Sequence, residues 1–329
     1  MKKIIIPILL MFIYSCSENF DPYGELKDKY VLNCIIRGDT TFQTATLSRT
    51  YLVTNNDPYS STIDPAVRNA SIRIWNGDSI VVLRDTVIDR PQSSAYKYPY
   101  HLYYTNKFVF TPGKSLDIEV RLENGSKLRS HTIPPAPVQF SYVEKNIPFR
   151  NNESVYFAWN AGLTDQTYVT RISIYYYKKV NGVNVFYKKE IPLRYENFND
   201  QLVPIFPSAT NNNSLTIGME TISETMSSLS QGDENKGNYE IIAAFLEVIA
   251  LDKNLSTYFN STARSLDDVS VKLDETDFTN VENGFGIFGI YLRNTWVVPF
   301  TPTYVRSFGY IPGFGTVDYP FENRIGRND

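Results

Sequence analysis

The sequence predicts a mainly β protein with two β-sandwich-like domains, immunoglobulin- or fibronectin-like, and a small helical addition near the C-terminus. Three observations predict this fold class. Short runs of alternating or β-branched residues recur along the chain, as in the strands of sandwich domains. Asn-Gly pairs follow several of these runs and favour the tight turns of β-hairpins. The stretch Pro134–Pro137 separates two sets of runs, so we place a domain boundary there.

The N-terminus has the features of an export signal. A short basic start precedes the uncharged apolar run 4–14, which is too short to span a bilayer as a permanent helix. The small residue Ser15 then precedes Cys16, as at a bacterial lipoprotein cleavage site. We therefore expect 1–15 to be a lipoprotein signal peptide whose removal leaves lipid attached to Cys16. The alternative is an ordinary signal peptide with an incidental cysteine.

Residues 16–28 are predicted to form a flexible tether, because they are polar and include Pro22 and Gly24. In the rest of the chain, no segment is apolar enough to cross a membrane as a helix. The hydrophobic fraction of 42% is nevertheless ample for a folded core. The formal net charge of −3 gives no electrostatic reason to expect nucleic acid or anionic lipid as a partner.

The second cysteine, Cys34, lies in the apolar run 30–36 and is expected to be a small core residue. If Cys16 carries lipid, no cysteine remains to form a disulfide with Cys34. A nucleophilic role is not indicated either, because only His101 and His131 could serve as its base and nothing in the sequence pairs them with it.

The first predicted domain spans 29–134. Its turns are expected at Asn76-Gly77-Asp78 and at Asn124-Gly125. The run 116–123 alternates apolar and charged residues, which is typical of a half-buried strand with one face in water. Strands are expected at 30–37, 45–53, 70–75, 79–83, 108–110, 116–123 and 127–133.

The second predicted domain spans 135–329, with strands expected at 155–159, 168–178 and 183–190. Asn181-Gly182 is a strong hairpin signal between the last two. The polar stretch 207–238 is expected to form surface loops with one short helix, 219–229. The run 239–250 fits both a helical period and a buried strand. Asp252 is then expected to cap a helix whose apolar stripe contains Leu255, Tyr258 and Phe259.

Several motifs resemble cofactor or metal sites but lack the required context. The run Gly284–Gly289 matches G-x-G-x-x-G, yet Ile290–Leu292 continues it as a strand where a dinucleotide site needs a helix. We expect the glycines to serve close backbone packing. With two histidines in the chain and Cys34 as its one unlipidated cysteine, we expect no metal site and no cofactor. Adjacent acids such as Asp267-Asp268 are expected to be solvated.

Tyrosines are the enriched residue type that points to a function, with 24 in the chain. The densest group is expected to form a ligand- or partner-binding surface, since each ring offers a rigid apolar face and a polar tip. Within it, Pro99 argues against a central strand. The alternative is that these rings pack the edge of the sandwich. The run 175–177 is instead expected to divide between the two faces of a strand. The group consists of Tyr96, Tyr98, Tyr100, Tyr103 and Tyr104.

Motifs that can be compared with a known family occur at Cys16, 30–36, 46–50, 67–74, 110–116, 255–259 and 279–289. In these motifs the chain resembles a lipoprotein family of the Bacteroidota catalogued as domain of unknown function 4249. The resemblance runs along nearly the whole mature chain, but its motifs are structural and transfer no active site. It implies a strand at 239–250, and it implies a gene context beside TonB-dependent outer-membrane transporters. Glu18 and Asp21 also resemble the surface-export signal of such lipoproteins, unless they are simply solvated.

Together these features predict an outer-membrane lipoprotein that is anchored by lipid. Exposure at the cell surface is the expected orientation, and the alternative is that the protein faces the periplasm. Its expected work is non-catalytic binding, as an accessory subunit of a TonB-dependent nutrient transporter. One alternative is a fimbrial or adhesive lipoprotein, which is also built from sandwich domains. The other is a hydrolase with an unrecognised carboxylate site, because the geometry of such a pair is set only by the tertiary structure.

Overall fold

The computed structural model describes residues 29–50, 64–91, 94, 98–109, 111, 113–148, 153–160, 166–198, 201–264 and 278–317. The predicted signal peptide, the tether and Cys16 lie outside these residues. The described chain is mainly β, as predicted, with short helices that include one after residue 252. No helix in the described part is long and apolar enough to span a membrane.

The N-terminal lobe contains β1 (Tyr30–Arg37), β2 (Gln43–Arg49), β3 (Ser71–Asn76), β4 (Ser79–Ile88), β5 (Tyr100–Thr105), β6 (Leu116–Arg121) and β7 (Lys127–Thr132). The C-terminal lobe begins with β8 (Phe140–Val143), β9 (Ser154–Trp159), β10 (Thr167–Val180), β11 (Val183–Ile191), β12 (Arg194–Phe198), β13 (Gln201–Ile205) and β14 (Ser214–Gly218). It continues with α2 (Met219–Ser228), η2 (Lys236–Asn238), β15 (Tyr239–Leu251), α3 (Lys253–Arg264), β16 (Phe285–Val298), α4 (Pro302–Ser307) and β17 (Ile311–Pro312).

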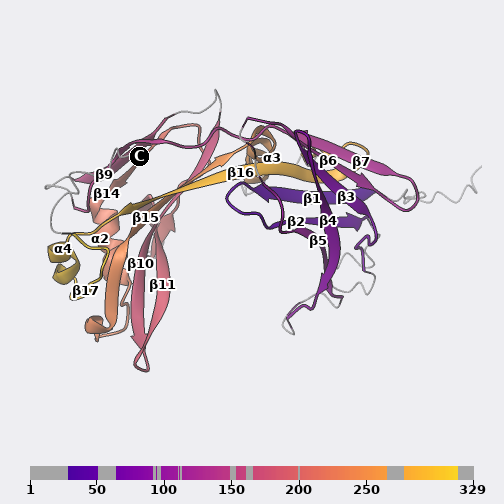
Figure 1. The fold of residues 1–329 in the computed structure, drawn as a ribbon. Helices are drawn as coiled ribbons and strands as arrows, with labels where there is room; N and C mark the ends of the chain where they lie inside the picture. Colours follow the sequence, from indigo (N-terminus) through magenta and orange to yellow (C-terminus); the bar gives the residue numbers. More distant parts are fainter. Residues whose placement is uncertain are drawn as a thin grey trace, which may run out of the picture.

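One long sheet joins the two lobes (Figure 1). Among the described residues it has 12 strands in the order β11-β10-β15-β16-β1-β2-β5-β4-β3-β6-β7, with β17 beside β15. The strand β16 connects the lobes, because it pairs antiparallel with β15 and parallel with β1. Strands from both sides of the boundary predicted after residue 134 therefore share this sheet.

Each lobe has its own hydrophobic core, and both cores use the same face of β16. Phe288 and Ile290 pack into the N-terminal core, where they meet Leu32 and Cys34 of β1. Further along β16, Val298 packs into the C-terminal core. The long sheet in that lobe is covered by a three-stranded sheet, ordered β14-β9-β8, which contributes Trp159. The alternation of side chains along β16 thus supplies both cores from one face.

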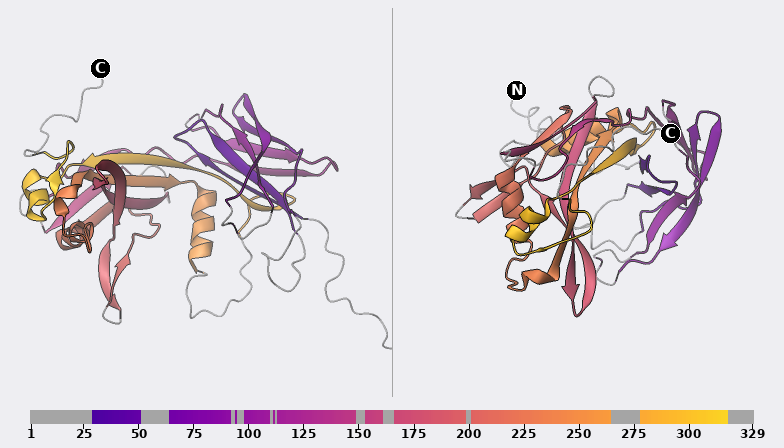
Figure 2. Two further views of the ribbon diagram at one scale, coloured as in Figure 1. Left: turned by 90° about the horizontal axis from the view of Figure 1, so that it is seen from below. Right: turned by 60° about the vertical axis from the view of Figure 1, so that its left-hand side comes forward.

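The other face of β16 carries α3, which stands off the sheet between the lobes (Figure 2, left). Leu255 of the helix packs against Leu251 of β15 and Ile287 of β16. The glycines of the G-x-G-x-x-G run allow close packing on β16, at Gly286 against β1 and at Gly289 against α3. A Cβ on Gly286, whose φ is +107°, would lie 2.0 Å from the Leu32 carbonyl oxygen. A Cβ on Gly289 would lie 2.6 Å from Leu255 Cγ. The predicted packing role of the run is confirmed.

Local predictions agree with the structure where the signal is a turn or a cap. The turns at Asn76-Gly77 and Asn181-Gly182 join the predicted hairpins, with positive φ at both glycines. The helix predicted at 219–229 is α2. The ambiguous run 239–250 is the strand β15, as the family resemblance implied.

The inference drawn from Pro99 is wrong. β5 begins at Tyr100, directly after the proline, and pairs with both β2 and β4 as a central strand. Proline is tolerated at a strand boundary because its missing N–H is not needed by the ladder there.

Candidate functional site

The predicted tyrosine group divides because β5 alternates its side chains between two faces. Tyr103 points into the N-terminal core and is 2% exposed. Its hydroxyl donates to the Val67 carbonyl at 2.8 Å and accepts from the Ala70 N–H at 3.1 Å. Burial raises the pKa of Tyr103. Tyr103 is therefore a hydrogen-bonded core residue, and its ring is not available to a ligand or partner.

Tyr98 and Tyr100 remain accessible and line one cavity of about 430 Å³, which we term the tyrosine pocket. Tyr100 is 39% exposed. The other walls come from the 46–48 segment of β2 and from 64–66. Tyr104 lines a separate pocket, and Tyr96 lies outside the described residues. Of the five predicted tyrosines, the structure therefore brings two together at one cavity.

Arg90 organises the tyrosine pocket. Its guanidinium carbon lies 5.6 Å from the ring centre of Tyr98 and 5.1 Å from that of Tyr100. Its Nε also donates a hydrogen bond to the Tyr98 carbonyl at 2.9 Å. Cation–π contacts of this kind hold the positive charge beside two aromatic faces. The pocket therefore offers flat apolar surface and a guanidinium within one small volume.

An acid–imidazole pair completes the polar part of this pocket. His101 Nε2 lies 2.9 Å from Asp64 Oδ2, and the histidine side chain is 6% exposed. Since Nε2 is the donor to the carboxylate, Nδ1 holds the lone pair when the ring is neutral. Nδ1 is buried and has no hydrogen-bond partner among the described residues. Ser48 lines the same pocket, but within that part of the chain no hydrogen bond joins its hydroxyl to His101.

A second surface was not identified from the sequence. It lies on the long β10–β11 hairpin, which projects from the C-terminal lobe (Figure 1). The burial pattern leaves 183–189 exposed, so both faces of this edge strand are open to solvent. Phe186, 52% exposed, contacts Tyr175, which in turn stacks on Phe245 of β15 at 4.1 Å. The predicted division of 175–177 between two faces is confirmed, because Tyr176 packs into the C-terminal core.

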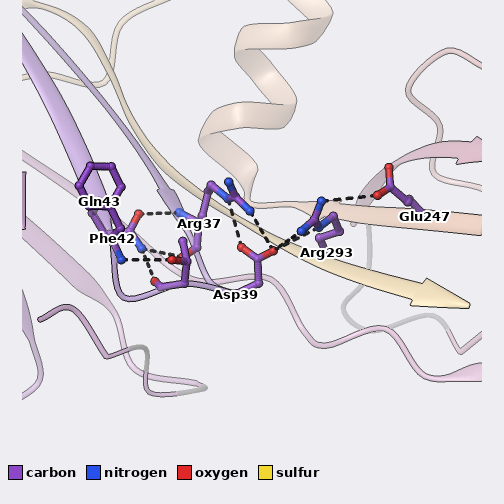
Figure 3. A network of polar contacts seen from close by, with 7 residues as sticks. Arg37, Asp39, Phe42, Gln43, Glu247 and Arg293 are labelled. Atoms are coloured by element: carbon purple, nitrogen blue, oxygen red, sulfur yellow. Dashed lines mark hydrogen bonds and ion pairs between the residues drawn. The ribbon is translucent and has the colours of Figure 1, made fainter. Parts of the chain in front are cut away.

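A polar network crosses the junction of the two lobes (Figure 3). Asp39 accepts from Arg37 Nε at 3.2 Å and lies 2.9 Å from Arg293 Nη2 of β16. Arg293 Nη1 in turn lies 3.5 Å from Glu247 of β15. Burial acts to raise the pKa of Asp39, but the two guanidinium groups outweigh it and the pKa is lowered. Exposed ion pairs contribute little free energy, so this network mainly orients the loop after β1.

Asp252 caps α3, as predicted, and also ties the helix to the sheet. Its Oδ1 accepts from the Leu255 N–H and its Oδ2 from the Ile290 N–H, both at 2.7 Å. The Thr132 hydroxyl donates to the same Oδ2. The residue is 2% exposed, and burial raises its pKa to about 6 although these hydrogen bonds oppose the rise. Asp252 lines neither pocket, so its perturbed pKa belongs to a structural carboxylate.

Cys34 is free and buried, as predicted, and burial raises the pKa of its thiol to about 12. Within the described ranges, no group of three or more His, Cys, Asp or Glu side chains is arranged to hold a metal ion. The acidic pair Asp267-Asp268 lies outside those ranges.

Comparison with known proteins gives a family but no activity. No curated protein matches the sequence. One family model, described as "Domain of unknown function (DUF4249)", matches residues 18–295. This range includes strands β1 to β15 and most of β16, so it covers both lobes. The resemblance seen in the sequence is thereby confirmed, and the chain belongs to the DUF4249 family.

Proposed function

We propose that this protein is a non-catalytic binding lipoprotein, anchored at the outer membrane through Cys16, that serves as an accessory subunit of a TonB-dependent nutrient transporter. The tyrosine pocket carries the proposal. It combines two accessible tyrosine rings, the Arg90 guanidinium and the Asp64–His101 pair at one cavity. Rings and polar groups placed together suit a ligand or partner that is itself partly apolar and partly polar.

The same pocket supports binding over catalysis. A general base needs a lone pair that can reach the reacting proton. In His101 one nitrogen is engaged by Asp64, and the other is buried without a partner among the described residues. Lipid on Cys16 would keep the protein in the plane of the membrane beside its partner, which raises the effective concentration without a tight interface.

Two variants test this function directly. Tyr98→Ala and Tyr100→Ala should weaken association with the transporter by about 1–2 kcal/mol or more, as for aromatic residues at interfaces. Their melting temperatures should hardly move. The measurement is co-purification of a β-barrel protein from detergent-solubilised outer membranes with the tagged full chain, paired with thermal melts. Tyr156→Ala, a 41% exposed tyrosine on β9, is the matched control.

Three outcomes would count against the proposal. If no β-barrel protein co-purifies with the wild type, the accessory role is wrong. A large drop in melting temperature for Tyr98→Ala and Tyr100→Ala would show that these rings are structural. If a glycan or peptide is turned over and Asp64→Asn abolishes the turnover, the protein is a hydrolase.

A second candidate function, fimbrial or adhesive assembly, is favoured by one observation. β11 is an edge strand of the long sheet and is exposed along 183–189. Unpaired edge strands offer N–H and C=O groups to a strand of another chain. Val183→Lys with Val185→Lys would place charges on this edge and should abolish fibres. The absence of fibres in the wild type would exclude this alternative, whereas fibres that persist in the variant would show that they do not assemble through the β11 edge.

A further inference from the structure

A second cavity lies on the outer face of the N-terminal lobe, apart from the tyrosine pocket. It measures about 550 Å³ and is formed by the strands β4 and β5 with the segment that follows β5. We call it the β4 groove. Cavities of this size hold small ligands. Its lining residues are Asn76, Ser79–Val82, Arg84, Tyr104–Lys107, Val109 and Thr111.

One wall of the β4 groove is aliphatic and exposed. Ile80 and Val82 are each 54% exposed, and Val109 is 68% exposed. The alternate residues of β4, Val81 and Leu83, pack into the N-terminal core. Ile80 and Val82 point the other way and are not part of that core. Alternation along β4 therefore places two aliphatic side chains on the groove side, where water would otherwise cover them.

The groove is also positively charged. Arg84 and Lys107 line it, and no Asp or Glu does. Neither cation forms an ion pair within the part of the chain that the structure describes. The whole chain carries a formal charge of −3, so a site with two cations and no acid runs against the average of the surface. Such a site attracts anions and leaves both cations available to them.

Asn76 fixes the aliphatic wall in place. Its side-chain nitrogen donates to the Val109 carbonyl at 2.6 Å and to the Thr111 hydroxyl at 3.0 Å. The residue is 6% exposed, and its Oδ1 is buried with no partner among the described residues. These contacts hold Val109 at the rim, so the groove is formed before any ligand arrives.

We propose that the β4 groove binds an aliphatic carboxylate, with its hydrocarbon chain on Ile80, Val82 and Val109 and its carboxylate on Arg84 and Lys107. The aliphatic wall selects a chain, and the two cations without a competing acid select the negative charge. A free fatty acid and the acid-terminated end of a larger lipid share this chemistry. The proposal concerns a different cavity from the tyrosine pocket and does not depend on the transporter association.

The test is equilibrium binding of radiolabelled octanoate to the full chain in lipid nanodiscs, with empty nanodiscs as background. We expect saturable binding of octanoate and none of octylammonium, which has the same chain and the opposite charge. Arg84→Gln with Lys107→Gln should weaken binding roughly tenfold or more, because it removes hydrogen bonds to a charged group. Lys188→Gln with Arg306→Gln, two exposed cations of the C-terminal lobe, is the matched control and should bind as the wild type does.

Several results would overturn the proposal. Octanoate retention equal to that of empty nanodiscs, or equal saturable binding of octylammonium, would each refute it on the wild-type protein alone. Unchanged affinity in the Arg84–Lys107 variant would show that these cations do not recognise the carboxylate. An unlabelled phosphatidylcholine whose second acyl chain is azelaoyl, and so ends in a carboxylate, distinguishes the sources when it is added to the nanodiscs. Displacement of octanoate would point to the acid-terminated chain of a larger lipid, and no displacement would point to a free acid.

Discussion

Asp252→Asn should change how the stability of this protein depends on pH. The pKa of Asp252 is raised to about 6 in the folded state, whereas an unfolded aspartate titrates near 4. At a pH between these two pKa values, Asp252 is protonated in the folded chain and ionised in the unfolded chain. Folding is therefore favoured below about pH 4, and this contribution is lost as the pH rises through 6. Ionised Asp252 should cost about 3 kcal/mol at pH 7 relative to the protonated form.

The variant separates the charge from the hydrogen bonds. Asparagine caps a helix about as well as aspartate. It has one acceptor oxygen, however, and the N–H groups of Leu255 and Ile290 both require one. One backbone N–H should lose its partner at a cost of about 1–3 kcal/mol at every pH. Removal of the charge offsets this cost at neutral pH and gives no benefit in acid.

We therefore expect Asp252→Asn to be clearly destabilising at pH 4.5 and close to neutral at pH 7.5. The difference in unfolding free energy between wild type and variant should move by about 2 kcal/mol in favour of the variant across this range. Urea unfolding of the full chain, followed by tryptophan fluorescence and circular dichroism, measures it. Asp117→Asn, which alters an exposed carboxylate, is the control and should follow the wild type. Parallel pH profiles for wild type and Asp252→Asn would refute the reasoning.

The remaining predictions concern four positions. Cys16→Ala should give unprocessed or soluble protein, and membrane-fraction labelling by a fatty-acid analogue that persists in this variant would contradict lipid attachment. Cys34 should resist alkylation in the native protein, because it is buried and its thiol pKa is raised to about 12, so rapid labelling before unfolding would show the burial to be wrong. Gly286→Ala should cost roughly 3 kcal/mol or more in urea unfolding, because its Cβ would collide with the Leu32 carbonyl, whereas Gly125→Ala, in an open turn, should cost much less. Tyr103→Ala should cost roughly 3–5 kcal/mol as a buried aromatic, and a thermal melt equal to that of wild type would place Tyr103 at the surface.

The sequence predicted local features well because short-range chemistry controls them. The Asn-Gly pairs at 76–77 and 181–182 set the sign of φ and so fix two hairpins. Asp252 was recognisable as a cap because the residue type and the apolar stripe after it act within one helical turn. The burial of Cys34 also followed from its apolar run. The segment 239–250 was harder, because burial on both faces in parts of β15 removes the alternation that would identify a strand.

The candidate site was only partly predictable. The sequence shows that tyrosines are dense in this segment. Which of their rings line the same cavity depends on where β5 begins and on which face of the sheet each side chain lies. Pro99 misled the prediction because a proline just outside a strand looks the same in sequence as one inside it. Asp64 and Arg90 come from segments outside the tyrosine group, and no spacing rule brings them to Tyr98, Tyr100 and the neighbouring His101.

What the sequence by itself determined is the β character of the chain, its hairpins and the cap at Asp252. The tertiary structure alone decided that β16 returns from the C-terminal part to pair in parallel with β1 and fill the N-terminal core. It alone assembled the tyrosine pocket and the β4 groove. The physical reason is that hairpin turns and caps depend on neighbouring residues, whereas the pairing of distant strand edges depends on which surfaces the whole chain can bury together.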